Sequence, residues 1–147
     1  MAQQDDACTL LDEEHNQAIR LFEQYKAARD GARKQIFARQ VCHDLLVHMQ
    51  IEEEIFYPAF QRATGDTYRV DDSEREHQEA RGLIARVESD PLDDKAMLDL
   101  EDAILHHVND EREKMFPEAR KAKGLDLMQL AAQLTARKAE LTAAHPA

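Results

Sequence analysis

The sequence predicts an all-α protein: an antiparallel up-and-down four-helix bundle with an additional C-terminal helix. The 147 residues include 4 Gly, 4 Pro and no Trp, whereas β-rich proteins need more turn-forming, aromatic and β-branched residues. Apolar residues recur every three or four positions through long segments, which is the period of a helix. Short breaks separate these segments, and short connections make neighbouring helices antiparallel. The length suits a single domain spanning 1–147.

The first two helices are delimited by breaks in this periodicity. The first is expected over about 6–29 and ends near Gly31. The second is expected over about 33–62, with Pro58 near its end. Both are long enough to form full members of a bundle.

The next two helices show capping and stop signals. Ser73 and Glu76 have the spacing of a capping box, so the third helix is expected to begin at Ser73 and to end before Pro91. The fourth is expected over about 93–123, ending at Gly124. The bundle thus occupies about 6–123.

A fifth amphipathic segment covers about 125–142 and closes the chain. Two roles fit its apolar stripe: it can cap the bundle, or it can contact a second subunit or a partner protein. Capping is the simpler expectation.

Charge and composition argue against several classes of partner. The formal net charge is −11, so nucleic acid and anionic membranes are repelled. No apolar run approaches the roughly 20 residues that span a bilayer, and the acidic N-terminus has no signal-peptide core. The two cysteines, Cys8 and Cys42, form no CxxC pair, which is typical of a reducing compartment. The expected location is the cytoplasm.

The chain contains an internal repeat of half its length. An adjacent Glu-His pair occurs on the first helix and again on the third. A histidine followed four residues later by a glutamate, and ten residues later by a proline, occurs on the second and the fourth helices. The paired positions are Glu14-His15 with Glu76-His77, His48 and Glu52 with His107 and Glu111, and Tyr57-Pro58 with Phe116-Pro117.

The histidines and the second-helix and fourth-helix glutamates share helical faces with apolar residues, so they are expected to point into the core. A buried carboxylate without a partner costs several kcal/mol, on the order of 3–5. A lone histidine on an apolar face is more often an ordinary core residue, and a lone His-x-x-x-Glu is often a helical pair. Two copies in register favour a metal site instead, with ligands His15, His48, Glu52, His77, His107 and Glu111.

At these residues the chain resembles the hemerythrin family, in particular bacterial hemerythrin-like HHE cation-binding domains, over about 9–120. The resemblance implies a bundle around two non-haem iron ions, bridged by carboxylates and by an oxo or hydroxo group. It implies Glu52 and Glu111 as bridges, His15 and His48 on one iron, and His77 and His107 on the other.

The chain departs from the oxygen-carrying members at one position. They have a further histidine one turn before the position of His77, where this chain has Ser73. The second iron then has an open position, or takes Tyr57, Tyr68, Glu74 or solvent. An open position suits reaction with a small ligand.

Three single positions each allow two interpretations. His106 precedes His107 directly, but His107 is in register with His48 and is the expected ligand. Asp44 lies one turn before His48. It either accepts a hydrogen bond from the imidazole N–H of His48 that does not face the metal, or it is a surface residue. Cys8 is either a buried thiol or a redox-sensitive one.

A ferritin-like site needs Glu-x-x-His on two helices, and only Glu74 with His77 fits that spacing. The functional hypothesis is therefore a di-iron protein that binds or senses oxygen, nitric oxide or iron. The alternative is an enzyme that decomposes peroxide or reduces nitric oxide. A structural bundle that has lost its site is a third hypothesis, which the intact set of six ligands disfavours.

Overall fold

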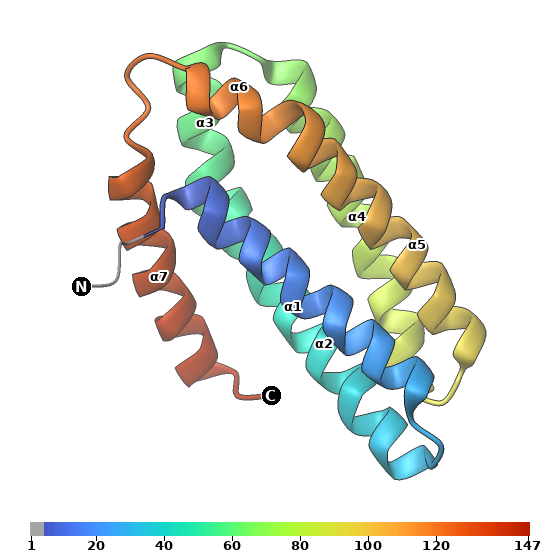
Figure 1. Ribbon diagram of the computed structural model, residues 1–147. Coiled ribbons are helices and arrows are strands. Elements are labelled where there is room, and N and C mark those ends of the chain that lie inside the picture. The colour runs from blue at the N-terminus through green and yellow to red at the C-terminus, as the bar shows by residue number, and fades with distance from the viewer. Residues whose placement is uncertain (1–4) are drawn as a thin grey trace.

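The computed structural model describes residues 5–147, and the regular elements within that range are helices (Figure 1). Residues 1–4, the start of the segment used to argue against a signal peptide, lie outside the described range. The four members of the bundle and the additional helix confirm the predicted fold class. The bounds are α1 (Ala7–Ala27); α2 (Gly31–Ile51), η1 (Glu52–Phe56) and α3 (Tyr57–Thr64) in one continuous rod; α4 (Thr67–Ser89); α5 (Asp94–Asp110), η2 (Glu111–Met115) and α6 (Phe116–Lys121) in a second rod; and α7 (Leu127–Ala144).

Aspartates begin the long helices. In each case the side chain accepts a hydrogen bond from the backbone N–H three residues later, which satisfies a donor that has no partner within the helix. Glycines in the left-handed region occur at two helix ends: Gly65, with φ 71°, caps α3, and Gly124, with φ 81°, follows α6. The capping aspartates are Asp6, Asp30, Asp66, Asp93 and Asp126.

The third bundle helix begins earlier than the capping-box pattern predicted. α4 starts at Thr67, and Asp66 is its cap, accepting from the backbone N–H of Arg69 at 3.0 Å. Ser73 lies inside the helix and is buried, so its assignment as a cap was wrong. The physical reason is that Asp66 follows a left-handed Gly65 immediately, which leaves room for a tight turn and an earlier start.

Each of the two rods widens for one turn at the same place in the repeat. The π-helical turns η1 and η2 begin at Glu52 and Glu111, and in both the turn closes with a hydrogen bond spanning five residues. Pro58 and Pro117 follow at once. A proline has no N–H and its ring clashes with the carbonyl four residues earlier, so a wider turn lets the rod continue through it.

The apolar core has two clusters with buried polar side chains between them. One cluster includes Leu11, Ile51 and Met115, and the other includes Ala18, Leu45 and Ile104. His15, between Leu11 and Ala18 on α1, illustrates the arrangement. The polar layer is thus shielded from water on both sides by packed side chains.

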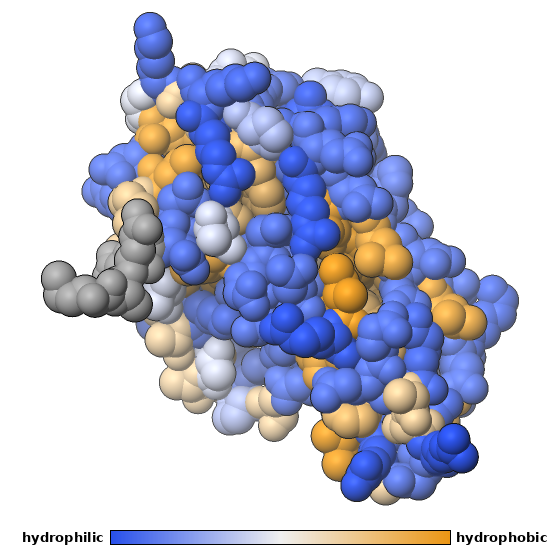
Figure 2. Space-filling model, in the orientation of Figure 1, coloured by the Kyte–Doolittle hydropathy of each residue, from blue (hydrophilic) through white to orange (hydrophobic). Residues whose placement is uncertain are grey.

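The additional helix α7 lies along α1 and α2 on the outside of the bundle (Figure 1). Its buried residues Leu130, Leu134 and Leu141 join the same core cluster as Leu11, which supports the capping role. Large exposed apolar residues are scattered over several elements, with Met128 the one on α7, and Figure 2 shows a mainly hydrophilic face with small apolar patches. A partner at α7 stays a prediction. None of the described helices combines the length and apolarity needed to cross a bilayer.

Candidate metal centre

The structure brings all six predicted side chains together in the polar layer between the two apolar clusters. Each bundle rod contributes: α1 and α4 give one histidine each, and the two longer rods give a histidine and the glutamate that opens the π-helical turn. All are at least 95% buried, with exposed fractions of 3% for His15, 5% for His48, 0% for Glu52, 1% for His77, 4% for His107 and 0% for Glu111.

One half of the cluster contains His15, His48 and both glutamates, with ligand atoms all within 4.8 Å of one another. His15 Nε2 lies 2.9 Å from Glu111 Oε1, and His48 Nε2 lies 3.1 Å from Glu52 Oε1. Both imidazole nitrogens, together with Glu52 Oε2 and Glu111 Oε1, are buried without a partner in hydrogen-bond geometry. Converging buried atoms of this kind are costly unless a cation joins them.

The other half contains His77, His107 and Glu52, also within 4.8 Å. His77 Nε2 lies 3.2 Å from Glu52 Oε1, and His107 Nε2 lies 3.2 Å from Glu111 Oε1. Each glutamate therefore lies between one histidine of the first half and one of the second. A carboxylate with two oxygens in this place can serve two cations at once.

Tyr57 belongs to this second half. Its hydroxyl donates to Glu111 Oε2 at 3.0 Å and lies 3.1 Å from His77 Nε2 and 3.3 Å from Glu52 Oε1. Two other residues named above for the open position on the second iron, Tyr68 and Glu74, are exposed. The π-helical turn explains the placement, because it brings Tyr57 onto the same face as Glu52, five residues earlier.

The two halves differ at the equivalent position of the repeat. Phe116 corresponds to Tyr57, and its ring stacks on the His15 imidazole with centroids 6.0 Å apart. Tyr57 lies against His77 with centroids 5.4 Å apart. One half thus has a phenyl ring and the other a phenol, so the two candidate cation positions are chemically unequal.

A carboxylate holds the outer nitrogen of each histidine. These contacts fix the orientation of the imidazoles and leave Nε2 directed into the cluster. The pairs are His15 Nδ1 with Asp12 at 3.0 Å, His48 Nδ1 with Glu14 at 2.7 Å, His77 Nδ1 with Glu53 at 2.6 Å, and His107 Nδ1 with Glu76 at 2.7 Å.

Sequence reasoning missed these carboxylates and left Asp44 open between a partner of His48 and a surface residue. Asp44 contacts Gln40 and His43 instead of His48. A signal was present, because Glu14 and Glu76 are the glutamates of the repeated Glu-His pairs. Each reaches the histidine of the neighbouring rod, which a search along one helix cannot find.

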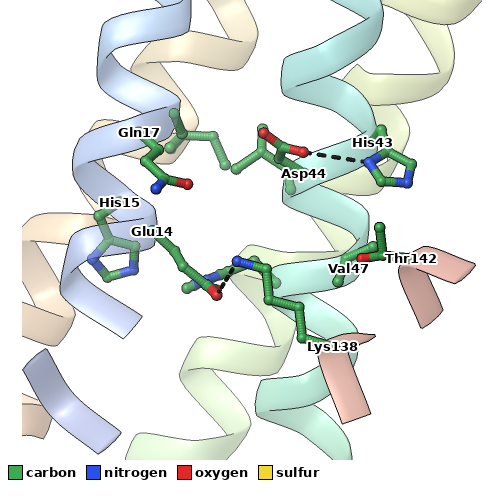
Figure 3. Close-up of a pocket in the computed structure, with 12 residues that line it drawn as sticks. Glu14, His15, Gln17, His43, Asp44, Val47, Lys138 and Thr142 are labelled. Atoms are coloured by element: carbon green, nitrogen blue, oxygen red, sulfur yellow. Dashed lines mark hydrogen bonds and ion pairs between the residues drawn. The ribbon is translucent and has the colours of Figure 1, made fainter. Parts of the chain in front are cut away.

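Basic side chains complete three of these contacts. Arg112 binds Asp12, Lys138 binds Glu14 at 2.8 Å, and Arg81 binds Glu53 at 2.8 Å. Figure 3 shows the contact between Lys138 of α7 and Glu14 of α1. Glu76 has His106 beside it, with His106 Nε2 at 3.1 Å. His106 is 70% exposed, so the structure places His107, and not His106, in the cluster.

Without a cation, the pKa values of several buried side chains in the cluster depart from their ordinary values. Burial lowers the pKa of His48, but the charge of Glu52 and the hydrogen bond to Glu14 outweigh it and raise that pKa to about 10. Burial favours neutral Glu52, yet the charge of His48 and hydrogen bonds hold its pKa well below 4.5. Burial and the charges of Glu111 and Glu52 raise the pKa of Tyr57 well above 10.0. The carboxylates therefore demand positive charge, which a bound cation would supply in place of the protons.

Imidazole and carboxylate donors with shared glutamates fit a pair of divalent or trivalent metal ions. These donors fit a metal pair better than a structural ion-pair network, because His15 Nε2 and Glu52 Oε2 are buried and have no partner in hydrogen-bond geometry.

Comparison with known proteins agrees with this geometry. The sequence matches the family described as Hemerythrin HHE cation binding domain over residues 6–119. The fold is similar to the crystal structure of a hemerythrin HHE cation-binding domain-containing protein from Mycobacterium kansasii, with a TM-score of 0.78 and 19% identity, covering 96% of this chain and 90% of that one. No curated protein matches the chain. Since the family match spans most of the sequence, including all six clustered residues, the chain belongs to the hemerythrin HHE cation-binding domain family.

Proposed function

We propose that the cluster holds two iron ions and that the protein binds or senses a small molecule, oxygen or nitric oxide, at this centre. The observation that supports it is the convergence of buried imidazole and carboxylate atoms that have no partner in hydrogen-bond geometry. His15 and His48 would hold one ion and His77 and His107 the other, with Glu52 and Glu111 between them. Iron suits this mixture of nitrogen and oxygen donors, and bound iron supplies reversible electron transfer and positions for small ligands.

The surrounding residues prepare the site for that use. The two apolar clusters exclude water above and below the polar layer. The four outer carboxylates keep the imidazoles fixed, so little reorganisation accompanies cation binding. Tyr57 places a protonated phenol beside His77 and Glu111, where it can act as a further ligand or as a proton donor.

That phenol favours a second candidate, an enzyme that decomposes peroxide or reduces nitric oxide, because cleavage of the peroxide O–O bond or the nitric oxide N–O bond needs a proton delivered to the leaving oxygen. Oxygen release from added peroxide in proportion to bound iron, reduced in Tyr57→Phe, would favour the enzyme. A reversible spectral change on oxygen exposure without turnover would favour the binding protein.

A cytoplasmic location, supported by the two unpaired cysteines, and a partner protein that receives the signal belong to the same proposal.

The experiment that tests the centre is elemental analysis of the purified protein together with its absorption spectrum before and after exposure to air. About two irons per chain are expected, since each glutamate lies between histidines of both halves and would serve both ions. Glu111→Gln should remove at least half of the metal, because it takes away a charge shared by both halves. Glu101→Gln is the matched control: Glu101 is also buried, on α5, but it pairs with Lys26 outside the cluster. Equal metal contents in the two variants would contradict the proposal.

A further inference from the structure

A small cavity lies between α1, α2 and α7 beside the first half of the centre. Its volume is about 60 Å³, which is enough for a few water-sized molecules. The residues that line it include His15 and His48, the apolar Ala18 and Val47, and Lys138. The cavity therefore extends from the outer helix to two of the side chains that the proposed iron centre uses.

Lys138 lines this cavity and is connected to the centre through Glu14. Its ammonium donates to Glu14 Oε2 at 2.8 Å, while Glu14 Oε1 accepts from His48 Nδ1 at 2.7 Å. Figure 3 shows Lys138 reaching across from α7 to Glu14, next to His15. The Lys138 side chain is 43% exposed and Glu14 only 11%. The lysine is thus the outer, more exposed member of the chain of contacts, and the glutamate is the inner, more buried one.

The origin of this cation distinguishes it from the others around the centre. Arg112 and Arg81 come from the four-helix bundle itself. They bind the carboxylates that hold the imidazoles of His15 and His77. Lys138 comes from α7, which lies beyond the residues 6–119 that match the family. The contact is therefore a property of the additional helix, and it connects that helix to the metal centre.

We propose that the cavity is the route by which small uncharged solutes reach the centre, and that Lys138 is its gate. The inference rests on the proposed iron site. A half-exposed lysine can rotate into solvent without any backbone movement, on the timescale of side-chain motion. Glu14 then keeps its hydrogen bond to His48, so the cavity opens while the imidazole stays in place.

Three substitutions test the gate. Lys138→Ala removes the side chain over the cavity. Arg137→Ala is the matched control: Arg137 is the neighbouring residue on α7 and also pairs with a bundle glutamate, Glu54, at 2.8 Å. It does not line the cavity, and Glu54 contacts none of the four clustered histidines. Ala18→Val places extra methyl groups at the cavity wall and should narrow it.

Two readouts are used. The first is the stopped-flow rate of nitric oxide binding to the reduced, iron-loaded protein. Nitric oxide is uncharged, so loss of the lysine charge does not change its attraction to the surface. The second is the relaxation of the Val47 methyl protons by dissolved oxygen in the metal-free protein, measured by NMR. This second readout needs no iron and reports directly whether a diatomic molecule enters the cavity.

Lys138→Ala should raise both the binding rate per bound iron and the Val47 relaxation several-fold. Arg137→Ala should leave both at the wild-type level, and Ala18→Val should lower both. The gate is overturned if Lys138→Ala and Arg137→Ala behave alike. If neither variant changes the two rates, Lys138 does not control access. If both variants raise them, the cause is loosening of α7. A protein that binds no iron would refute the proposed function, and the relaxation measurement would still decide whether Lys138 controls the cavity.

Discussion

His106 and His107 are neighbours in the chain, but the helix directs them to different environments. His107 lies on the core face of α5 at 4% exposure, and its Nε2 reaches Glu111 at 3.2 Å. His106 points outward and contacts Glu76 and Asp110. Successive residues on a helix are separated by about 100°, so only one of an adjacent pair can face a shared centre.

His107→Ala should therefore lower the metal content by about one ion per chain, because it would remove one of the proposed ligands from the second half of the centre. His106→Ala should leave the content near the wild-type level, with at most a modest loss of affinity transmitted through Glu76. Elemental analysis of both variants, followed by competition with a chelator, checks this. A larger loss of metal in His106→Ala than in His107→Ala would show that α5 is rotated about its axis relative to the structure.

The two cysteines have no part in the centre. Cys8 and Cys42 are buried, and burial raises the pKa of each thiol to about 12. The thiolate, which is the reactive form, is therefore scarce near neutral pH. This favours the interpretation of Cys8 as a packed core residue over that of a redox-sensitive thiol.

At the scale of elements, α4 shows how a local pattern can be correct in type and wrong in place. The spacing of Ser73 and Glu76 satisfies the capping-box rule, yet six residues upstream of that position Thr67 is already helical. Asp66 provides an equivalent oxygen at the earlier position. Ser73 is then carried onto the buried face one turn before His77, where the oxygen-carrying relatives have a histidine.

Asp66→Ala should lower the free energy of unfolding by about 1 kcal/mol, the usual cost of losing a helix cap. Asp66→Asn makes the same change in charge but keeps a capping oxygen, so it should remain close to wild type. Urea unfolding of the metal-free protein, followed by circular dichroism, measures both. If the two variants were destabilised equally, the effect would come from charge and not from capping.

At the scale of the whole molecule, the buried cluster makes stability depend on pH when no metal is bound. The pKa of His48 rises from 6.5 to about 10 on folding, so its contribution is complete below 6.5 and is lost as pH rises toward 10. The pKa of Glu52 falls below 4.5, so its contribution is present above 4.5 and is lost in acid. As far as these two groups are concerned, the metal-free protein is most stable between pH 4.5 and pH 6.5.

We therefore expect the unfolding free energy of the metal-free protein to fall as pH rises from about 6.5 toward 10. Metal binding should follow the opposite trend, since cations displace protons from the imidazoles and bind more tightly as pH rises. Urea titrations across this range, with and without iron, measure both trends. A metal-free stability that stays constant or increases over the window would show that His48 is not protonated in the folded state.

Much of this protein was determined by local sequence pattern. Helical periodicity predicted the bundle, and the repeated His-x-x-x-Glu identified residues that the structure brings together. An interval of four residues places two side chains on one face of a helix wherever that helix lies, so His48 with Glu52 and His107 with Glu111 could be read without a structure. The Tyr-Pro and Phe-Pro pairs likewise mark the two rods, although the pattern did not predict the π-helical turn before each proline.

Tertiary structure decided what depends on contacts between helices. The outer partners of three imidazoles, Glu14, Glu53 and Glu76, lie on a different element from the histidine each one holds. The choice of Tyr57 over Tyr68 depends on a turn that rotates one rod, and the position of Lys138 depends on where α7 docks. Periodicity records which face of a helix is buried, but not which neighbour covers that face, because the pairing of faces is set by the packing of the whole chain.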